Sequence, residues 1–398
     1  MKTIALRRLA EINPPAPYFD HVPDGERVLF LPLETVWADG RADQARRVPK
    51  IQVSSGYTRF HAGDIVSPKV TPTFQAGRTM IAEATGAGTT ELHVLRARPS
   101  VDPRWVAYAL RSKHFLREGV TAFEGVAGLQ RVPQRFLEEF RVADVPGDEQ
   151  RRIADFLDDR VARLDQVVAS RRAQIAMLRD SFTSFQINAV AGALPGYPCH
   201  SSDGQWFPWR GEGVGLVKFS RVATLQRGVD LTAEEQVLGV HPVVTTAGVA
   251  GWHSQFVAKG PGVVIGRYGS VGNVHWVDHD FWPHNTTLYV KDPLGNDLRW
   301  VYYLLRVFPY SAMQARSAVP GVNRNNMATE TVPLPPVSLQ REIVKVLDDR
   351  VERDEHLLFG LERSIALVNE YKQSLITAAV TGEFDVTTAS TRIPGEHA

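Results

Sequence analysis

The five residues LDDRV occur twice in this chain, at Leu157–Val161 and at Leu347–Val351. The match extends without a gap, so that DEQRRIADFLDDRVARLD at 148–165 lies over SLQREIVKVLDDRVERDE at 338–355. Long-range self-similarity fixes an architecture, because each copy must fold in the same way. The sequence therefore predicts a duplicated unit, and each copy has a head followed by a long charged helix.

The heads match less closely than the helices. DPRWVAYALR at 102–111 resembles DLRWVYYLLR at 297–306, and RLAEI at 8–12 resembles RVATL at 221–225. Their offsets are 195 and 213 residues, whereas the offset between the two copies of LDDRV is 190 residues. Residues have therefore been gained and lost in the heads but not in the helices.

Both helices carry apolar residues at the a and d spacing of a coiled coil. The first seam is interrupted by Arg171 and the second by Asp354 and Lys372. Seams that match in period but differ in residues favour one specific helix pair. The predicted seam residues are Leu157, Val161, Leu164, Ile175 and Leu178 in the first helix, and Leu347, Val351, Leu358, Leu361 and Ile365 in the second.

Each helix is predicted to begin after a proline, Pro146 or Pro336, and to end at a glycine, Gly192 or Gly382. Such a helix is roughly 65 Å long. Since a domain's entry and exit often lie close together, the second helix is predicted to run antiparallel to the first. The alternative is a bundle that contains two exposed charged helices.

The heads read as short β-prone runs punctuated by glycine, with a short helix near the end of each. We therefore predict an α+β fold in which two heads of mixed β-structure and short helices are joined by two long antiparallel coiled-coil helices, with a pseudo-twofold internal repeat. The predicted boundaries are 1–146 for the first head, 147–192 for the central helix, 193–337 for the second head, 338–386 for the C-terminal helix and 387–398 for a disordered tail.

Composition limits the class of protein. The single cysteine, Cys199, excludes an internal disulfide and a cysteine-cluster zinc site. No apolar run is long enough to span a bilayer, and the N-terminus has charges where a signal peptide has its apolar core, so we expect no membrane contact and a cytoplasmic location. The net charge is only +1, so DNA binding would depend on local loops and not on a strongly basic domain.

Several segments resemble the DNA-specificity subunit of a type I restriction–modification system. The helix entries VADVPGDEQRRIADFLDDRV at 142–161 and VPLPPVSLQREIVKVLDDRV at 332–351 carry that family's proline followed by glutamine. Head two has HPVVTTAGVAGWHSQF, GVVIGRYGSVGNV and WPHNTTLYV in the family's order, and head one has GDIVSPKVTP and TTELHVLRA. The resemblance covers nearly the whole chain.

The resemblance implies a non-catalytic specificity subunit of an N6-adenine DNA methyltransferase or type I restriction complex. Each head would read one half of an asymmetric bipartite site in double-stranded DNA, and the helices would set the spacer and bind two methyltransferase subunits. Restriction or translocase subunits are further partners. S-adenosylmethionine and ATP with magnesium would belong to those partners, so we expect no cofactor in this chain. The rival function is a coiled-coil scaffold whose heads bind protein.

Polar residues in matching loops of the heads are the candidates for reading DNA, since Arg and Lys pair with guanine and Asn and Gln with adenine in the major groove. The loop SPKVTPTFQAGR at 67–78 matches GRYGSVGN at 266–273, and GLQR at 128–131 is paired with GVNRNN at 321–326. The candidates are Lys69, Thr71, Thr73, Gln75, Arg78, Gln130 and Arg131 in head one, and Thr245, Thr246, Arg267, Tyr268, Ser270, Asn273, Asn323 and Arg324 in head two.

Other interpretations of these motifs remain open. GRYGSVG also fits a simple β-turn with an exposed arginine, and Asn323 also fits a helix cap. His275, His279 and His284 lack partner ligands at recognisable spacing, so we predict no metal site there. NPPAPY at 13–18 lacks the aromatic residue of a methyltransferase motif directly after its prolines, and GRYGSVG lacks the lysine of a phosphate-binding loop. We therefore predict no catalytic residue.

Overall fold

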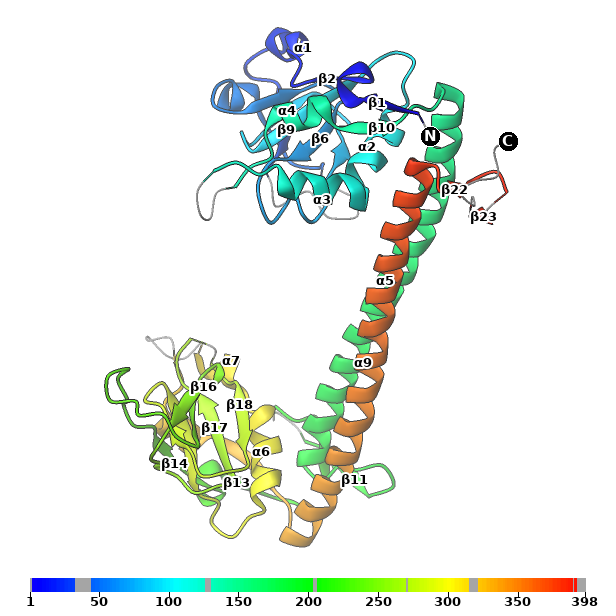
Figure 1. Cartoon of the computed structure of the whole chain (residues 1–398). Coiled ribbons are helices and arrows are strands. Elements are labelled where there is room, and N and C mark those ends of the chain that lie inside the picture. Colours follow the sequence, from blue (N-terminus) through cyan, green and yellow to red (C-terminus); the bar gives the residue numbers. More distant parts are fainter. Residues whose placement is uncertain are drawn as a thin grey trace. The chain divides into compact units, whose positions relative to one another are not determined.

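The computed structural model describes residues 2–32, 44–125, 130–202, 206–269, 271–314, 321–388 and 390–391. The chain divides into two compact units (Figure 1). Unit 1 comprises Met1–Arg172 and Leu361–Ala398, and unit 2 comprises Ala173–Gly360. Both boundaries fall inside a long helix. Each unit therefore consists of one head together with part of each long helix.

Unit 1 contains two four-stranded sheets, with strand orders β2-β9-β6-β7 and β4-β3-β8-β5, and the pair β1-β10. Buried residues from α2, α3 and α4 join strand residues and both long helices in one apolar core. The strands are β1 Thr3–Ala5, β2 Ala10–Ile12, β3 Arg27–Leu31, β4 Arg47–Pro49, β5 Thr58–Phe60, β6 Ile65–Pro68, β7 Met80–Ile81, β8 Gly86–Gly88, β9 Leu92–Ala97 and β10 Arg141–Ala143. The helices are η1 Leu6–Arg8, α1 Pro17–His21, η3 Lys50–Val53, α2 Pro103–Arg111, α3 Lys113–Thr121 and α4 Gln134–Glu139.

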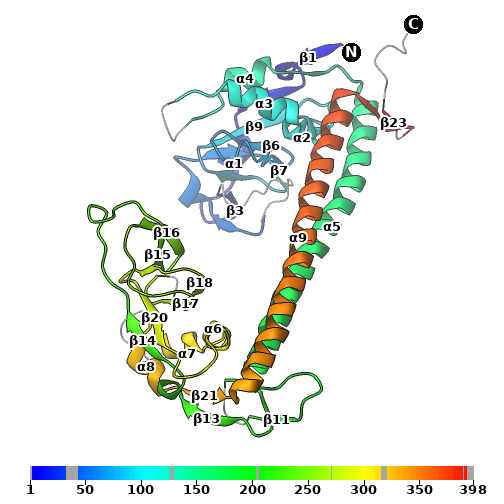
Figure 2. The ribbon, with the colours of Figure 1, turned by 60° about the horizontal axis from the view of Figure 1, so that its bottom comes forward.

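Unit 2 contains sheets of order β14-β20-β17-β18 and β16-β15-β19, and the pairs β13-β21 and β11-β12. The β13-β21 pair lies beside the start of the last long helix (Figure 2). The strands are β11 Cys199–Ser201, β12 Trp209–Gly211, β13 Gly215–Lys218, β14 Thr224–Arg227, β15 His241–Thr245, β16 Gly248–His253, β17 Gly262–Gly266, β18 Val274–Val277, β19 Trp282–Pro283, β20 Thr287–Asp292 and β21 Thr331–Leu334. The short helices are η4 Phe219–Arg221, α6 Leu298–Arg306, α7 Tyr310–Gln314 and α8 Arg324–Thr329.

The two heads share one strand topology. The order β2-β9-β6-β7 in unit 1 corresponds to β14-β20-β17-β18 in unit 2. In the other sheet, β3 pairs parallel with β8 and antiparallel with β4, just as β15 pairs with β19 and β16. The predicted α+β class and the internal repeat are confirmed.

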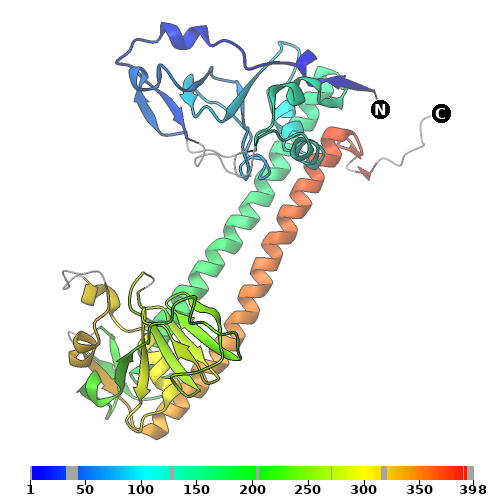
Figure 3. The same ribbon diagram turned by 60° about the vertical axis from the view of Figure 1, so that its left-hand side comes forward.

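The two long helices are α5, Gly147–Val190, and α9, Val337–Thr381. In unit 1, Asp165 of α5 pairs with Lys372 near the end of α9. In unit 2, Arg350 near the start of α9 donates to Ser181 of α5. Early residues of one helix thus meet late residues of the other, so the helices run antiparallel in each unit, as predicted (Figure 3).

Glycine follows each long helix. Gly192 and Gly382 both have φ of 78°, the left-handed conformation in which a helix commonly ends. Helix α9 ends before the predicted Val386, and Phe384–Asp385 form β22, which pairs with β23, Ser390–Thr391. This hairpin extends into the segment predicted to be disordered, and residues 392–398 lie outside the described part of the chain.

Three of the ten predicted seam residues are buried. Leu157 and Leu347 are fully buried, and Val161 is 6% exposed. The other predicted seam residues are half-buried: Leu164, Ile175, Leu178, Val351, Leu358, Leu361 and Ile365.

The polar interruptions of the seam have partners. The ammonium group of Lys372 lies 2.6 Å from the Asp165 carboxylate, with the side chains 10% and 17% exposed. The buried carboxylate of Asp354 accepts a hydrogen bond of 2.8 Å from Arg350. Position 372 corresponds to Phe182 in the repeat, so the two halves of the seam are chemically different. This difference disfavours pairing of α9 with a second α9.

We expect Leu157→Ala and Leu347→Ala each to lower the free energy of unfolding by about 2–5 kcal/mol, because each leaves a cavity in a fully buried site. Urea denaturation followed by circular dichroism measures the loss. Met177→Ala is the control, since Met177 is 70% exposed on α5 and its truncation should change stability by less than about 0.5 kcal/mol. Equal effects of all three substitutions would contradict the assignment of the seam.

Candidate nucleic-acid interface and its support

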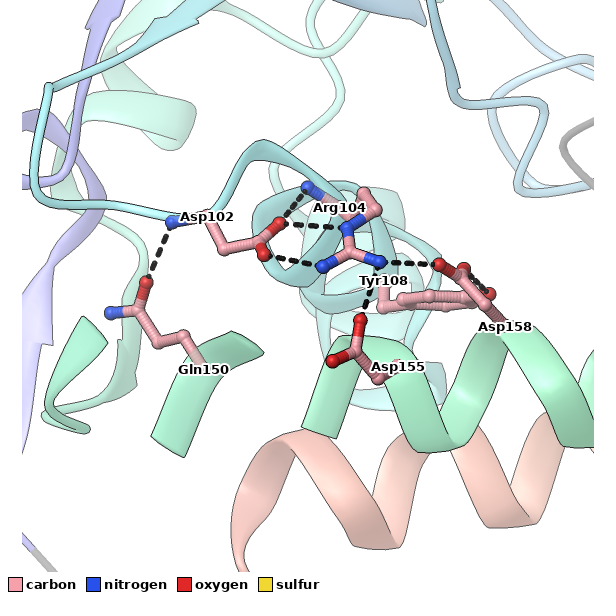
Figure 4. Close-up of polar contacts among 6 residues, drawn as sticks. All are labelled: Asp102, Arg104, Tyr108, Gln150, Asp155 and Asp158. Atoms are coloured by element: carbon pink, nitrogen blue, oxygen red, sulfur yellow. Dashed lines mark hydrogen bonds and ion pairs between the residues drawn. The ribbon is translucent and has the colours of Figure 1, made fainter. Parts of the chain in front are cut away.

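A polar network joins the head of unit 1 to α5 (Figure 4). The buried Gln150 side chain accepts a hydrogen bond from the backbone N–H of Asp102 at 3.1 Å and donates to the Val145 carbonyl at 2.9 Å. Asp102 caps α2 by accepting from the backbone N–H of Arg104 at 2.8 Å. The start of α2 is therefore tied to the start of α5.

Arg104 extends this network along α5. Its guanidinium contacts the carboxylates of Asp102, Asp155 and Asp158, each at 2.8 Å. Tyr108, one turn further along α2, donates to Asp158 at 2.7 Å. Burial, and then the bond to Asp158, raise the pKa of the Tyr108 hydroxyl, so it remains a donor at neutral pH.

Unit 2 repeats the network with equivalent residues. Gln340, fully buried, accepts from the backbone N–H of Asp297 at 2.8 Å and donates to Pro335 and Asn296. Arg299 contacts Asp348 at 3.0 Å, and the Tyr303 hydroxyl donates to the same carboxylate. Here, however, the guanidinium lies over aromatic rings, with distances to ring centroids of 4.7 Å for Trp276, 5.0 Å for Tyr302 and 5.4 Å for Tyr303.

The repeated LDDRV is explained by these contacts. Its leucine is buried in the core of each unit, and its first aspartate binds an arginine and a tyrosine of the head helix. In the first copy the second aspartate, Asp159, pairs instead with Arg163 on the same exposed helix face. LDDRV is therefore the attachment point between a head and its long helix.

In unit 1 the loop after β6 and the segment at 130–132, both predicted to contact DNA, meet beside the sheet β2-β9-β6-β7. The backbone of Lys69, directly after β6, donates to Glu91 at 2.8 Å and accepts from the N–H of Val132 at 2.9 Å. Val70 and Arg131 form an adjacent antiparallel bridge. The β6–β7 loop and the segment from Gln130 to Val132 are thus held together by backbone hydrogen bonds.

The corresponding loops of unit 2 meet in the same way. The backbone of Arg267, directly after β17, donates to Thr286 at 3.0 Å and accepts from the N–H of Val322 at 2.9 Å. Gly321, with φ of 156°, lies so close to Tyr268 that a Cβ would be 2.8 Å from its ring. Lys69 and Arg267 therefore occupy equivalent positions in the repeat.

This equivalence corrects one pairing predicted from the sequence. Gln130 was paired with Asn323, but the backbone bonds make Val132 the counterpart of Val322. The six-residue helices α4 and α8 then align, so that Gln134 corresponds to Arg324 and Pro133 to Asn323. The pairing of Gln130-Arg131 with Asn323-Arg324 was therefore wrong by three residues. These dipeptides lie in loops, where nothing local fixes the register.

The candidate residues of head one differ in exposure. Gln75 and Gln130 are exposed, and Thr71 and Arg78 are half-buried. Thr73 is 8% exposed and donates to the Val70 carbonyl at 2.7 Å, so its hydroxyl stabilises the loop internally and the prediction that it contacts DNA is corrected.

Two predicted cations of head one have protein partners. Lys69 is half-buried, and its ammonium group donates to the Thr90 carbonyl at 3.0 Å. Arg131 is exposed and makes two hydrogen bonds of 2.7 Å to the Glu91 carboxylate, which lower the pKa of Glu91. Glu91 is not among the predicted residues, although it lies in the segment TTELHVLRA at 89–97.

Most candidate residues of head two gather at the ends of β15, β17 and β18. The Thr246 carbonyl accepts from Asn273 at 3.4 Å and lies 3.1 Å from the His275 ring. Thr245 donates to Gly248 at 3.0 Å and closes the β15–β16 turn. The Arg267 guanidinium lies 4.4 Å from the centroid of the Tyr268 ring. Ser270 lies outside the described residues.

The two candidates at α8 have different roles. The Asn323 side chain accepts from the backbone N–H of Asn325 at 2.9 Å, so it is the helix cap that the sequence left open as an alternative. Arg324, the next residue, is exposed.

Two of the three histidines considered for metal binding, His275 and His284, have separate contacts. His275 lies beside Thr246, and His284 lies 3.1 Å from the Thr286 hydroxyl. Within the described ranges, no group of three His, Cys, Asp or Glu side chains is arranged to hold a metal ion. Nor does any helix in those ranges combine the length and apolar character needed to cross a membrane.

Part of the chain is similar in sequence to known proteins. Residues 223–356 match the family described as the type I restriction modification DNA specificity domain. The chain is 33% identical over 172 residues to the type I restriction enzyme EcoEI specificity subunit of Escherichia coli, and 35% identical over 156 residues to the EcoAI specificity subunit. These matches cover 41% and 37% of this chain but only 28% and 26% of the relatives' lengths. The predicted resemblance to this family is confirmed for the part of the chain that these matches cover.

The fold is shared over almost the whole chain with one solved structure. It is described as showing the structural basis underlying complex assembly and conformational transition of the type I R-M system. The TM-score is 0.72 at 15% identity, covering 96% of this chain and 97% of the other. The likeness extends the fold assignment beyond the part that matches the family model.

We expect Gln150→Ala and Gln340→Ala each to lower the free energy of unfolding by about 1–3 kcal/mol, because each leaves buried backbone groups without a partner. Chemical denaturation of the whole chain measures the loss. Arg151→Ala is the control, since Arg151 is the exposed neighbour of Gln150 on α5. If both glutamine variants matched this control, the junction would not depend on the amide bonds.

The stability of unit 1 should depend on His93 at acidic pH. Burial lowers the pKa of His93 from 6.5 to about 4, and its ring is held by Val132 and Asn13. The unfolded chain therefore binds a proton below about pH 6.5 that the folded chain resists until about pH 4, so stability falls across this window as pH falls. Comparing urea midpoints of the wild type and His93→Gln between pH 7.5 and 4 should show a smaller decline in the variant. Parallel declines would contradict this role.

Proposed function

We propose that this chain is a sequence-specific DNA-recognition subunit that reads an asymmetric bipartite site. One observation carries the proposal. In each unit the loop that follows β6 or β17 is joined to the segment before α4 or α8 by equivalent backbone hydrogen bonds, at Lys69 in unit 1 and at Arg267 in unit 2. Loops at one edge can enter a DNA groove together. Because the loops differ in sequence between the units, each unit would read a different half-site.

The proposal extends to partners and chemistry. Two methyltransferase subunits would bind the long helices, restriction or translocase subunits would join them, and S-adenosylmethionine and ATP with magnesium would be bound by those subunits. This chain would supply recognition without catalysis, in the cytoplasm, and the helices would set the length of the unread spacer. Docking is supported by apolar side chains exposed on the long helices, at Met177, Leu357, Phe359, Leu367 and Tyr371, which are 49–70% exposed.

A protein-binding scaffold is the rival function. The exposed apolar residues of the long helices are consistent with both functions. The features that distinguish a scaffold from a DNA-recognition subunit therefore lie in the heads. A scaffold needs no polar loops at equivalent edges, whereas a DNA reader does.

Co-expression of the chain with its cognate methyltransferase, followed by long-read mapping of methylated adenines, tests the proposal. We expect one bipartite motif with two unlike halves. Gln75→Ala with Arg78→Ala should relax the half read by unit 1, and Asn273→Ala the half read by unit 2, because each removes side chains suited to base contacts. Lowered discrimination of about 1–3 kcal/mol per lost base contact is expected.

Glu149→Ala and Arg151→Ala, which lie outside both the loops and the proposed docking residues, are controls for assembly and should leave the motif unchanged. A stable complex that methylates no motif would favour the scaffold. A motif unaffected by any of the loop variants would leave DNA reading in place and remove these loops as its source.

A further inference from the structure

We propose that Lys69 and Arg267 are equivalent phosphate-binding residues, one in each unit, which position DNA without reading its sequence. This inference rests on the proposed function and separates two roles within the candidate residues. Lys69 and Arg267 would hold the backbone, while the loops that follow them would contact the bases.

The first argument is structural equivalence. Each residue directly follows the third strand of its four-stranded sheet, β6 or β17, and each backbone makes the same two hydrogen bonds. The donors and acceptors, Glu91 with Val132 and Thr286 with Val322, are themselves equivalent in the repeat. The two backbone hydrogen bonds fix the position from which each side chain extends.

The second argument is chemical. A lysine stands in one unit and an arginine in the other, and these residues are interchangeable as positive charges but not as paired donors to a guanine edge. Whatever the two half-sites are, both units meet the same sugar–phosphate backbone of DNA. A position that is basic in both units, without a conserved fork geometry, fits that common feature.

The environments of the two cations support this role. Lys69 is half-buried and lines an open cavity of about 500 Å³ together with Asn13, Tyr57 and Arg59. Burial lowers the pKa of Lys69, and a bound anion would offset this effect. The Arg267 guanidinium makes no side-chain hydrogen bond or ion pair within the described part of the chain, and lies against the Tyr268 ring. Both charges are held in place and retain donors for a phosphate.

The segments after the two cations differ, as base-reading elements should. The β6–β7 loop continues through 70–79 with the exposed Gln75, whereas the β17–β18 connection is a shorter turn that contains Gly269, Gly272 and Asn273. Gly272 lies against the ring of Tyr310, where a Cβ would come within 2.6 Å. The cations are equivalent in place, while the segments between strands diverge in length and composition.

The test measures DNA affinity of the assembled complex, with full-length chain and methyltransferase, against salt concentration. Lys69→Met and Arg267→Met keep most of the aliphatic stem and remove the charge. We expect each to weaken binding to the target and to a scrambled sequence by the same factor. The slope of log K against log salt should become less steep by about 0.9, so the affinity ratio between 50 and 200 mM salt falls about 3.5-fold. The methylated motif should stay unchanged.

Lys69→Arg and Arg267→Lys are the matched controls and should retain affinity, salt slope and motif. Asn273→Ala is the contrast, and it should alter the motif with little change in slope. The inference is overturned if a methionine variant relaxes bases in one half-site, if the slope stays unchanged, or if Arg267→Lys behaves like Arg267→Met. Failure of the wild-type complex to select any motif would instead overturn the proposed function.

Discussion

A buried amide in each unit joins the start of a head helix to the start of a long helix. Gln150 and Gln340 each receive one backbone N–H from the start of a head helix and donate to a carbonyl just before a long helix. Because a buried amide loses several kcal/mol of solvation unless it is paired, this geometry tolerates little displacement. The strands that carry the candidate loops belong to the same apolar core as that head helix, so loop positions in each unit depend on this bond.

The two junctions reach the same geometry with different chemistry. Arg104 has three carboxylate partners, whereas Arg299 has one carboxylate and three aromatic rings. The counterpart of Asp155 in the second copy is Lys345, which cannot accept from an arginine. Stacking on aromatic rings compensates for the missing carboxylates. The repeat therefore preserves the place of the arginine more strictly than the identity of its neighbours.

Features with a local or periodic signal could be predicted from the sequence. The seam spacing predicted the long helices, the repeat predicted equivalent heads, and the loops after β6 and β17 were matched correctly. Features that depend on tertiary contacts could not. Thr73 is buried because its loop folds back onto Val70, Arg131 is held by Glu91 from a distant strand, and the register of 130–132 is set by a bond to Lys69. Helix bounds also shifted slightly, because capping is decided by the last turn.

The backbone hydrogen bonds at the ends of β6 and β17 affect how the loop sequences that follow can vary. Lys69 and Arg267 begin their loops from equivalent backbone positions, and β7 and β18 receive the chain again in the same sheet. Between these fixed ends the unit 1 loop is longer, and closing a longer loop costs free energy only slowly with length. Insertions in this loop therefore add little to the free-energy cost of closing it. A new loop of moderate length can therefore begin and end at the same strands, without a change in the rest of the fold.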